Sequence, residues 1–207
     1  KQLVYTGHSY TTVKAKTKGM YAYSLATGET RTLVEDGALA IYHIGEEEGT
    51  VLFTASDLKQ YGSASGQDFY KLSLAGGGCE KLLAHELVPG TSPITDSTYG
   101  SGNAFVCAQG AAYYIVLDRF QSHIRSIDAA GVQQEILGFD GGIQMLDMRG
   151  GATVFVGMQK NSLQELYVLA GGKAVCISAF NSPLLSARAV QPVHYTPFQN
   201  RAGQQID

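Results

Sequence analysis

Two short stretches of the sequence resemble the turn Gly-x-Ser-x-Gly, which holds a strained nucleophilic serine between a strand and a helix. The stretch Gly62-Ser-Ala-Ser-Gly66 carries Ala64 at the nucleophile position, so it cannot supply that serine. Ser9 follows a strand-like segment, but the second glycine is missing and the β-branched residues after it do not predict a helix. We therefore predict a hairpin loop over 62–66 and no nucleophile at Ser9.

Phosphate-binding and metal-binding patterns are also incomplete. The run Ala75-Gly-Gly-Gly78 lacks the Gly-Lys-Ser/Thr ending of a phosphate loop, and no helical pattern follows it, so a turn is predicted. Pro89 stands where a zinc protease would place a second histidine after His85-Glu86. The histidines have no metal-ligand spacing; they are His8, His43, His85, His123 and His194.

The three consecutive acidic residues Glu46, Glu47 and Glu48 lie between two strand-like runs. Such a charged run is typical of a solvated turn rather than of an acid–base pair. With the serine, glycine and histidine patterns set aside, the sequence predicts no catalytic, cofactor-binding or metal-binding residues and no cofactor.

The composition restricts the kinds of protein and partner that the sequence can represent. The chain has 207 residues, 44% of them hydrophobic, with a mean hydropathy of −0.03, which is enough to build a buried core. The net charge of −3 and pI near 5.9 disfavour a nucleic-acid partner. No run approaches the roughly 18 apolar residues of a membrane helix, and no signal peptide opens the chain, so no membrane partner is predicted.

The cysteines are few and widely spaced. Cys79, Cys107 and Cys176 form no CxxC pair, which argues against a structural zinc site or a dense disulfide framework. Cys107 and Cys176 lie in apolar strand-like runs, so both are predicted to be buried thiols. This pattern favours a reducing, cytoplasmic setting.

The elements that would have to position any site are short strands. Four strand–turn–strand units recur, and in each a large apolar residue follows the first strand position: Tyr21, Tyr70, Ile124 and Tyr167. Their turn glycines, Gly28, Gly77, Gly131 and Gly172, are 49, 54 and 41 residues apart. Propeller blades repeat at roughly 40 to 50 residues, so the sequence predicts an all-β fold of propeller blades.

Two further strands precede each hairpin, except in the first unit, which has one. The prediction is a fragment of about four four-stranded antiparallel blades, a partial one at 1–37 and complete ones at 38–90, 91–140 and 141–182, followed by an exit segment at 183–207. Sheets that are apolar on both faces must stack. Three complete blades and a partial one predict an open arc, or a ring that blades of another copy complete. The opening at Lys1, already within a strand-like run, suggests an excised fragment whose exposed strand edges and blade faces would pair between copies.

The hairpins and the tail resemble the propeller of prolyl-oligopeptidase-family serine peptidases, most nearly the acylaminoacyl-peptidase-like branch. The residues that carry the resemblance are Val51–Asp57 leading to Asp68–Gly77, Thr153–Gly157 leading to Gln164–Tyr167, and the tail segments Ile177–Pro183 and Val193–Asp207. Within the tail, Ala202-Gly-Gln-Gln-Ile-Asp207 is similar to the start of the family's α/β-hydrolase domain.

The resemblance implies that one domain carries out catalysis and another controls access to the active site. In the family the serine, aspartate and histidine belong to the hydrolase domain, so no catalytic residue transfers to this chain. The family's propeller caps the active site and admits only small peptides. The implied partners are thus the α/β-hydrolase domain of the parent chain and the parent's peptide substrates.

Other propeller classes fit less well. A WD-repeat scaffold requires tryptophans, and the sequence has none. A kelch-like propeller, acting as a protein- or ligand-binding module, has the right period and glycine doublets but also lacks its expected tryptophans. A polysaccharide-lyase or surface-binding propeller is a further alternative that the sequence leaves open.

Overall fold

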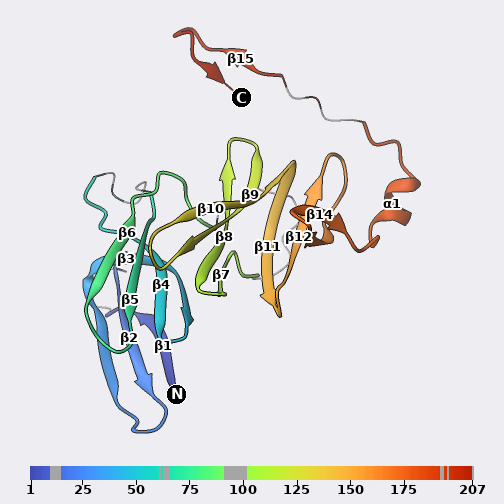
Figure 1. The fold of residues 1–207 in the computed structure, drawn as a ribbon. Helices are drawn as coiled ribbons and strands as arrows, with labels where there is room; N and C mark the ends of the chain where they lie inside the picture. Colours follow the sequence, from blue (N-terminus) through green and yellow to red (C-terminus); the bar gives the residue numbers. More distant parts are fainter. Residues whose placement is uncertain are drawn as a thin grey trace. The chain divides into compact units, whose positions relative to one another are not determined.

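The computed structural model describes residues 1–9, 15–60, 62, 66–90, 102–191, 194 and 196–206. Within these ranges the chain forms sixteen strands and one short helix, with antiparallel pairing in every sheet whose register is defined (Figure 1). The predicted all-β fold of about four propeller blades is confirmed, although the first two blades share a strand.

The N-terminal sheet contains the strands β1 Gln2–Gly7, β2 Lys18–Ser24, β3 Thr30–Glu47, β4 Thr50–Ser56, β5 Asp68–Ser73 and β6 Cys79–Leu83, in that order. The long strand β3 pairs with β2 through Thr30–Val34 and again at Leu39, opposite Lys18, and it pairs with β4 through Ala40–Glu47. Gly37, at φ +94°, lies between Val34 and Leu39, where the register with β2 shifts. The predicted units 1–37 and 38–90 therefore meet inside one continuous strand.

Two four-stranded sheets follow. One consists of β7 Phe105–Ala108, β8 Ala111–Asp118, β9 Gln121–Asp128 and β10 Gln133–Phe139. The next consists of β11 Gly141–Arg149, β12 Ala152–Gln159, β13 Glu165–Ala170 and β14 Lys173–Cys176. The tail contains helix α1 Ser182–Ser186 and a small hairpin of β15 Phe198–Gln199 and β16 Gln205–Ile206.

The tightest hairpins use two-residue turns in which both residues have positive φ. They are Glu48-Gly49, Gln109-Gly110, Gly150-Gly151 and Gly171-Gly172. Such turns match the right-handed twist of the flanking strands, which explains why glycine fills most of the positions. The predicted turn glycines Gly28, Gly77, Gly131 and Gly172 all have positive φ, as a turn requires.

The chain divides into two compact units, each with its own core. Unit 1 comprises 1–89, 107–113 and 126–134, and unit 2 comprises 90–106, 114–125 and 135–207. The core of unit 1 includes Met20 and Val34 from one blade and Val51, Phe53 and Leu72 from the next. In unit 2 an aromatic cluster of Phe139, Phe155 and Tyr167 is nearly inaccessible, with ring centroids 5.2–5.3 Å apart.

One burial prediction is wrong. Cys176 is exposed because it lies near the end of β14, the outermost strand of its sheet, where only one side has a neighbour. Cys107 is partly buried and Cys79 is exposed. Among the described residues, no helix is long and apolar enough to cross a lipid bilayer.

Candidate functional site

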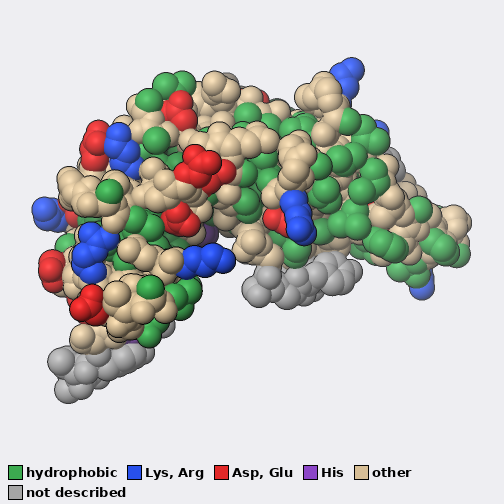
Figure 2. Space-filling view, turned by 60° about the horizontal axis from the view of Figure 1, so that its bottom comes forward, with side chains coloured by type: hydrophobic (Ala, Val, Ile, Leu, Met, Phe, Trp, Pro, Cys, Tyr) green, Lys and Arg blue, Asp and Glu red, His purple; other side chains and the backbone are tan. Residues whose placement is uncertain are grey.

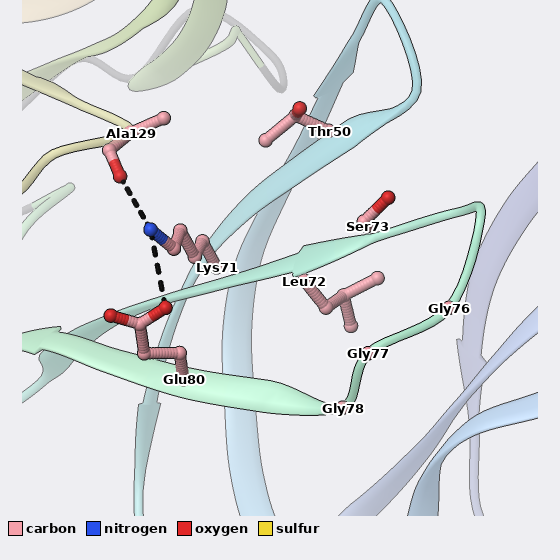
Figure 3. A pocket seen from close by; sticks show the side chains of 9 residues that line it. All are labelled: Thr50, Lys71, Leu72, Ser73, Gly76, Gly77, Gly78, Glu80 and Ala129. Carbon is pink, nitrogen blue, oxygen red and sulfur yellow. Dashed lines mark hydrogen bonds and ion pairs between the residues drawn. The ribbon is translucent and has the colours of Figure 1, made fainter.

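A hollow of about 290 Å³ opens in unit 1 beside the turn that joins β5 to β6. Lys71 and Glu80 are cross-strand partners on these strands, and the Lys71 Nζ lies 3.2 Å from the Glu80 Oε2 (Figure 3). The same Nζ donates to the carbonyl of Ala129, from the β9–β10 hairpin, at 2.9 Å. The ammonium is thus held between a carboxylate and a carbonyl from another sheet.

The opposite wall of the hollow is the predicted turn Ala75–Gly78. Gly76, Gly77 and Gly78 all have positive φ, and the Gly76 N–H donates to the Ser73 carbonyl at 3.1 Å. The turn leads directly into β6 rather than a helix, which confirms the turn prediction and disfavours a phosphate loop. In Figure 3 the Lys71 side chain extends away from the glycines, toward Ala129.

A second hollow of about 160 Å³ shares Thr50 and Ala129 with the first, and we call the two together the Lys71 groove. Glu47 lines it and caps the next sheet's tight turn: its Oε1 accepts the Gln109 N–H at 2.8 Å and its Oε2 accepts the Gly110 N–H at 2.7 Å. The prediction that 46–48 form a merely solvated turn is therefore wrong for Glu47. Its carboxylate satisfies two backbone donors of another hairpin.

Cys107 also lines the groove, but its thiol is unreactive. Burial raises the pKa of the Cys107 thiol to about 12, and the negative charge of Glu47 adds to the effect. At neutral pH the thiol stays protonated, whereas a nucleophilic cysteine must be a thiolate. Its Sγ lies against Gly45, where an added Cβ would clash.

The Lys71 groove can bind polar groups but lacks the parts of a catalytic centre. Its cation is already paired with Glu80 and Ala129, and Glu47 is committed to the Gln109-Gly110 turn. The hydroxyls of Thr50 and Ser73 and the glycine turn offer hydrogen-bonding groups for carbonyls and amides. Among the described residues that line it, no nucleophile is paired with a base.

The other residues that the sequence analysis considered occupy structural positions. Ser9 is exposed, and its backbone N–H donates to the Asp36 Oδ2 at 2.8 Å. The His85 Nδ1 lies 2.8 Å from the Leu87 carbonyl oxygen, and the ring packs edge-on against Phe69. Residues 63–65 of the predicted loop lie outside the described part of the chain.

His43 is partly buried, and this burial lowers its pKa, while its Nε2 lies 3.1 Å from the Pro89 carbonyl oxygen. Across the described residues, no cluster of three or more His, Cys, Asp or Glu side chains could hold a metal ion.

Sequence reasoning missed a polar cluster around Glu165 in unit 2. Its buried carboxylate accepts the Ser178 hydroxyl, the Phe180 N–H at 3.0 Å and the Asn181 N–H at 2.8 Å. The Ser178 hydroxyl bond, with the backbone donors, holds the pKa of this carboxyl below its usual range. The Asn181-Ser-Pro183 sequence is a helix-start signal that could have revealed the turn before α1.

The Glu165 cluster anchors the start of the tail. The Asn181 side chain also donates to the Gln164 carbonyl at 2.7 Å, so the chain is tied to β13 immediately before α1 begins. None of these groups forms a nucleophile–base pair, and the cluster is a structural anchor.

Comparisons with known proteins identify the fold. No protein-family model matches the sequence, and no curated protein sequence matches it. Solved structures do: acylaminoacyl peptidase from Pyrococcus horikoshii matches with a TM-score of 0.73 and 14% identity, over 99% of this chain and 30% of that one. The β-propeller domain of the Trilobed protease from Pyrococcus furiosus matches with a TM-score of 0.64 and 14% identity, over 87% of this chain and 52% of that one.

A puromycin hydrolase matches with a TM-score of 0.63 and 16% identity, over 99% of this chain and 31% of that one. At these identities the likeness shows the fold, and it confirms the predicted propeller of the kind found in prolyl-oligopeptidase-type peptidases. The chain spans about a third of the full-length peptidases and about half of the isolated propeller domain.

Proposed function

We propose that this chain is a non-catalytic propeller segment of a serine peptidase of the prolyl-oligopeptidase family, in the acylaminoacyl-peptidase-like branch. In this proposal the segment caps the active site of an α/β-hydrolase domain in the parent chain and limits entry to short peptides. The observation that carries it is the match of 99% of the chain to an acylaminoacyl peptidase at a TM-score of 0.73.

The described side chains support a capping rather than a catalytic role. The groups with nucleophilic potential are either protonated, as at Cys107, or lack an activating arrangement, as at Ser9. The domain division stays part of the proposal: blades at 1–37, 38–90, 91–140 and 141–182, and an exit segment at 183–207. A cytoplasmic location and pairing of copies through blade edges also stay predictions.

A labelling experiment separates the roles of the segment and its parent. A serine-directed phosphonate should leave the 207-residue chain unlabelled, and the chain should not hydrolyse acyl-peptide or aminoacyl-ester substrates. The parent protein should be labelled once, at a serine outside this segment. Labelling of Ser9, tested with Ser9→Ala, would overturn the non-catalytic assignment. An unlabelled, inactive parent would favour the alternative of a kelch-like or other binding module.

Substrate filtering requires the parent enzyme. We expect efficient hydrolysis of a short acyl-peptide and little cleavage of unfolded casein, because a capping propeller excludes long chains. Tyr167→Ala, which removes a ring from the cluster in unit 2, should raise casein cleavage relative to acyl-peptide hydrolysis. Val175→Ala, at an exposed position of β14, is the control. Equal cleavage of both substrates by the unmodified enzyme would refute filtering.

A further inference from the structure

Two cations reach from one blade to the next at the hairpin end of the sheets. The Arg31 Nη2 donates to the Leu74 carbonyl at 2.6 Å, and the Lys71 Nζ donates to the Ala129 carbonyl at 2.9 Å. Leu74 comes directly after β5 and Ala129 directly after β9, so each acceptor opens a hairpin turn of the following blade. The same kind of bond therefore recurs at two successive junctions.

The internal repeat explains why this bond recurs. Ala22 and Lys71 each follow the tyrosine of their hairpin, and their cross-strand partners are Arg31 and Glu80. Each pair thus supplies one base, from β3 in the first blade and from β5 in the second. In the third repeat Arg125 occupies the position of Lys71, but its ion pairs are with carboxylates of its own sheet. A base at this position therefore connects either two blades or the strands of one.

At the second junction, the contact of Lys71 is accompanied by one of opposite charge. The Glu47 carboxylate accepts the N–H groups of Gln109 and Gly110 at 2.8 and 2.7 Å, and these two residues form the β7–β8 turn. Ala129 opens the β9–β10 turn of the same sheet. The second blade therefore holds both hairpin turns of the β7–β10 sheet, one through a cation and the other through an anion. We call these two contacts the Lys71–Glu47 clasp.

The division of the chain into units agrees with this arrangement. Residues 107–113 and 126–134, which contain both clasped turns, belong to unit 1 together with the second blade, whereas residues 114–125 of the same sheet belong to unit 2. The clasped ends of the sheet are thus packed with the neighbouring blade. Charge-assisted hydrogen bonds are roughly twice as strong as neutral ones, so the clasp contributes to this attachment.

A thiol lies next to the clasp. Cys107 is partly buried, lines the Lys71 groove together with Glu47, and has its Sγ against Gly45 of β3. Gly110, one of the donors to Glu47, lines the same hollow. A movement of the β7–β8 turn away from Glu47 would widen this hollow and expose the Cys107 side chain. The reactivity of the thiol therefore reports whether the clasp is closed.

We propose that the Lys71–Glu47 clasp is a cooperative latch whose two contacts open together, releasing the turns of the β7–β10 sheet and uncovering Cys107. Both turns belong to one sheet, so a displacement that breaks one contact strains the other. While either contact is closed, it keeps the partners of the other at a high effective concentration, and this couples the two. The latch depends only on residues of unit 1 and not on the proposed peptidase role.

Each contact of the clasp is tested by a substitution at the other one, in the 207-residue chain. Lys71→Met should accelerate amide hydrogen exchange of Gly110, which donates to Glu47 and not to Lys71, on the order of tenfold. Glu47→Ala should accelerate acetylation of the Lys71 amine by acetic anhydride by a similar factor. NMR follows the exchange, and peptide mass spectrometry at low conversion locates the acetylation.

The thiol gives a third measurement. In a chain that carries Cys79→Ser and Cys176→Ser, Cys107 is the one remaining cysteine. Adding Lys71→Met to this chain should accelerate alkylation of Cys107 by iodoacetamide under native conditions, whereas Lys71→Arg, which keeps a charged donor, should leave it slow.

Matched variants separate the latch from a general effect of charge. Lys81→Met removes a cation that pairs with Asp68 of its own sheet, and Glu48→Ala removes a carboxylate that lines the groove but does not take part in the clasp. Both should leave the exchange of Gly110 and the acetylation of Lys71 unchanged.

The reciprocal effects decide the proposal. Faster reaction confined to the clasped turns, with an unchanged circular dichroism spectrum, is the expected result. Unchanged exchange of Gly110 in Lys71→Met, or unchanged acetylation of Lys71 in Glu47→Ala, would show two independent contacts and overturn the latch. Equal acceleration of exchange in β12, which belongs to unit 2, would also overturn it, because the whole chain would then be unfolding.

Discussion

Two buried or partly buried carboxylates hold backbone segments together in this protein. Glu47 accepts the two N–H groups of the Gln109-Gly110 turn, and Glu165 accepts those of Phe180 and Asn181. In both cases the acceptor and its donors are far apart in the sequence. A charged acceptor makes stronger hydrogen bonds than a neutral one. Each carboxylate therefore holds its turn or loop in place more firmly than a neutral acceptor would.

Glu165→Gln should lower the free energy of unfolding by about 1–3 kcal/mol at pH 7. The amide would turn an NH2 group toward N–H donors that now meet an oxygen. Because the pKa of Glu165 is lowered in the folded state, its contribution is complete above the unfolded-state pKa and is lost as pH falls through the folded-state pKa.

Urea unfolding between pH 7 and pH 3 checks this prediction. The difference between the unsubstituted chain and Glu165→Gln should shrink as the pH drops below the ordinary glutamate range. Glu86→Gln, at an exposed position, is the matched control and should change stability little. A Glu165→Gln deficit that stays constant down to pH 3 would contradict the ionised acceptor.

The three cysteines should differ sharply in reactivity. With its pKa near 12, the Cys107 thiol carries almost no thiolate at pH 8, and it is partly buried, whereas Cys79 and Cys176 are exposed. Burial also raises the pKa of the Cys79 thiol. Under native conditions a disulfide reagent should therefore modify Cys176 first and Cys79 more slowly, and Cys107 only after unfolding. Peptide mapping by mass spectrometry assigns the sites. Modification of Cys107 as fast as Cys176 would refute the protected environment.

At the scale of elements, the tight hairpins set the register of each sheet. In two of the four turns with positive φ at both positions, the first residue has a side chain: Glu48 at φ +50° and Gln109 at φ +56°. A left-handed conformation costs an L-residue about 1–2 kcal/mol, and asparagine tolerates it better than most. These two turns therefore carry local strain that the Gly150-Gly151 and Gly171-Gly172 turns avoid.

Glu48→Asn should raise the free energy of unfolding by about 0.5–1 kcal/mol, because asparagine suits the first position of this turn type. Urea denaturation with an unchanged m-value measures the gain. Glu48→Ala removes the same charge without relieving the backbone, so it should give no gain. Equal stabilisation by both variants would mean that charge, rather than turn conformation, is responsible.

The strands and their turns could be predicted from the sequence because local chemistry determines them. Alternating apolar residues mark β5 and β13, and the glycines mark the turns that follow. The continuity of β3 could not be predicted, since Gly37 is a turn signal that the pairing of both halves overrides. The Lys71 groove could not be predicted either, because Ala129, which accepts a hydrogen bond from Lys71, is 58 residues away from it in the sequence.

At the scale of the whole molecule, the sheet of β7–β10 belongs to both compact units. The first part of β8 lies in unit 1 and the rest, from Tyr114 on, in unit 2, and β9 is divided after Arg125. When a strand belongs to two units, unfolding of one unit removes part of the strand on which the other depends. We therefore expect the described blades to unfold together rather than unit by unit.

Phe139→Ala tests this coupling. The ring is 1% exposed and contacts Phe155 and Tyr167, so its loss should cost about 3–5 kcal/mol. If the shared strands couple the units, amide hydrogen exchange should accelerate in β12 and, by a similar factor, in β4, which lies in unit 1 and does not contain the substitution. Val132→Ala, at an exposed turn position, should leave exchange in both strands unchanged. Faster exchange confined to β12 would mean that the units open independently, because the sheet of β7–β10 would then separate between its two halves without disturbing the core around Phe53.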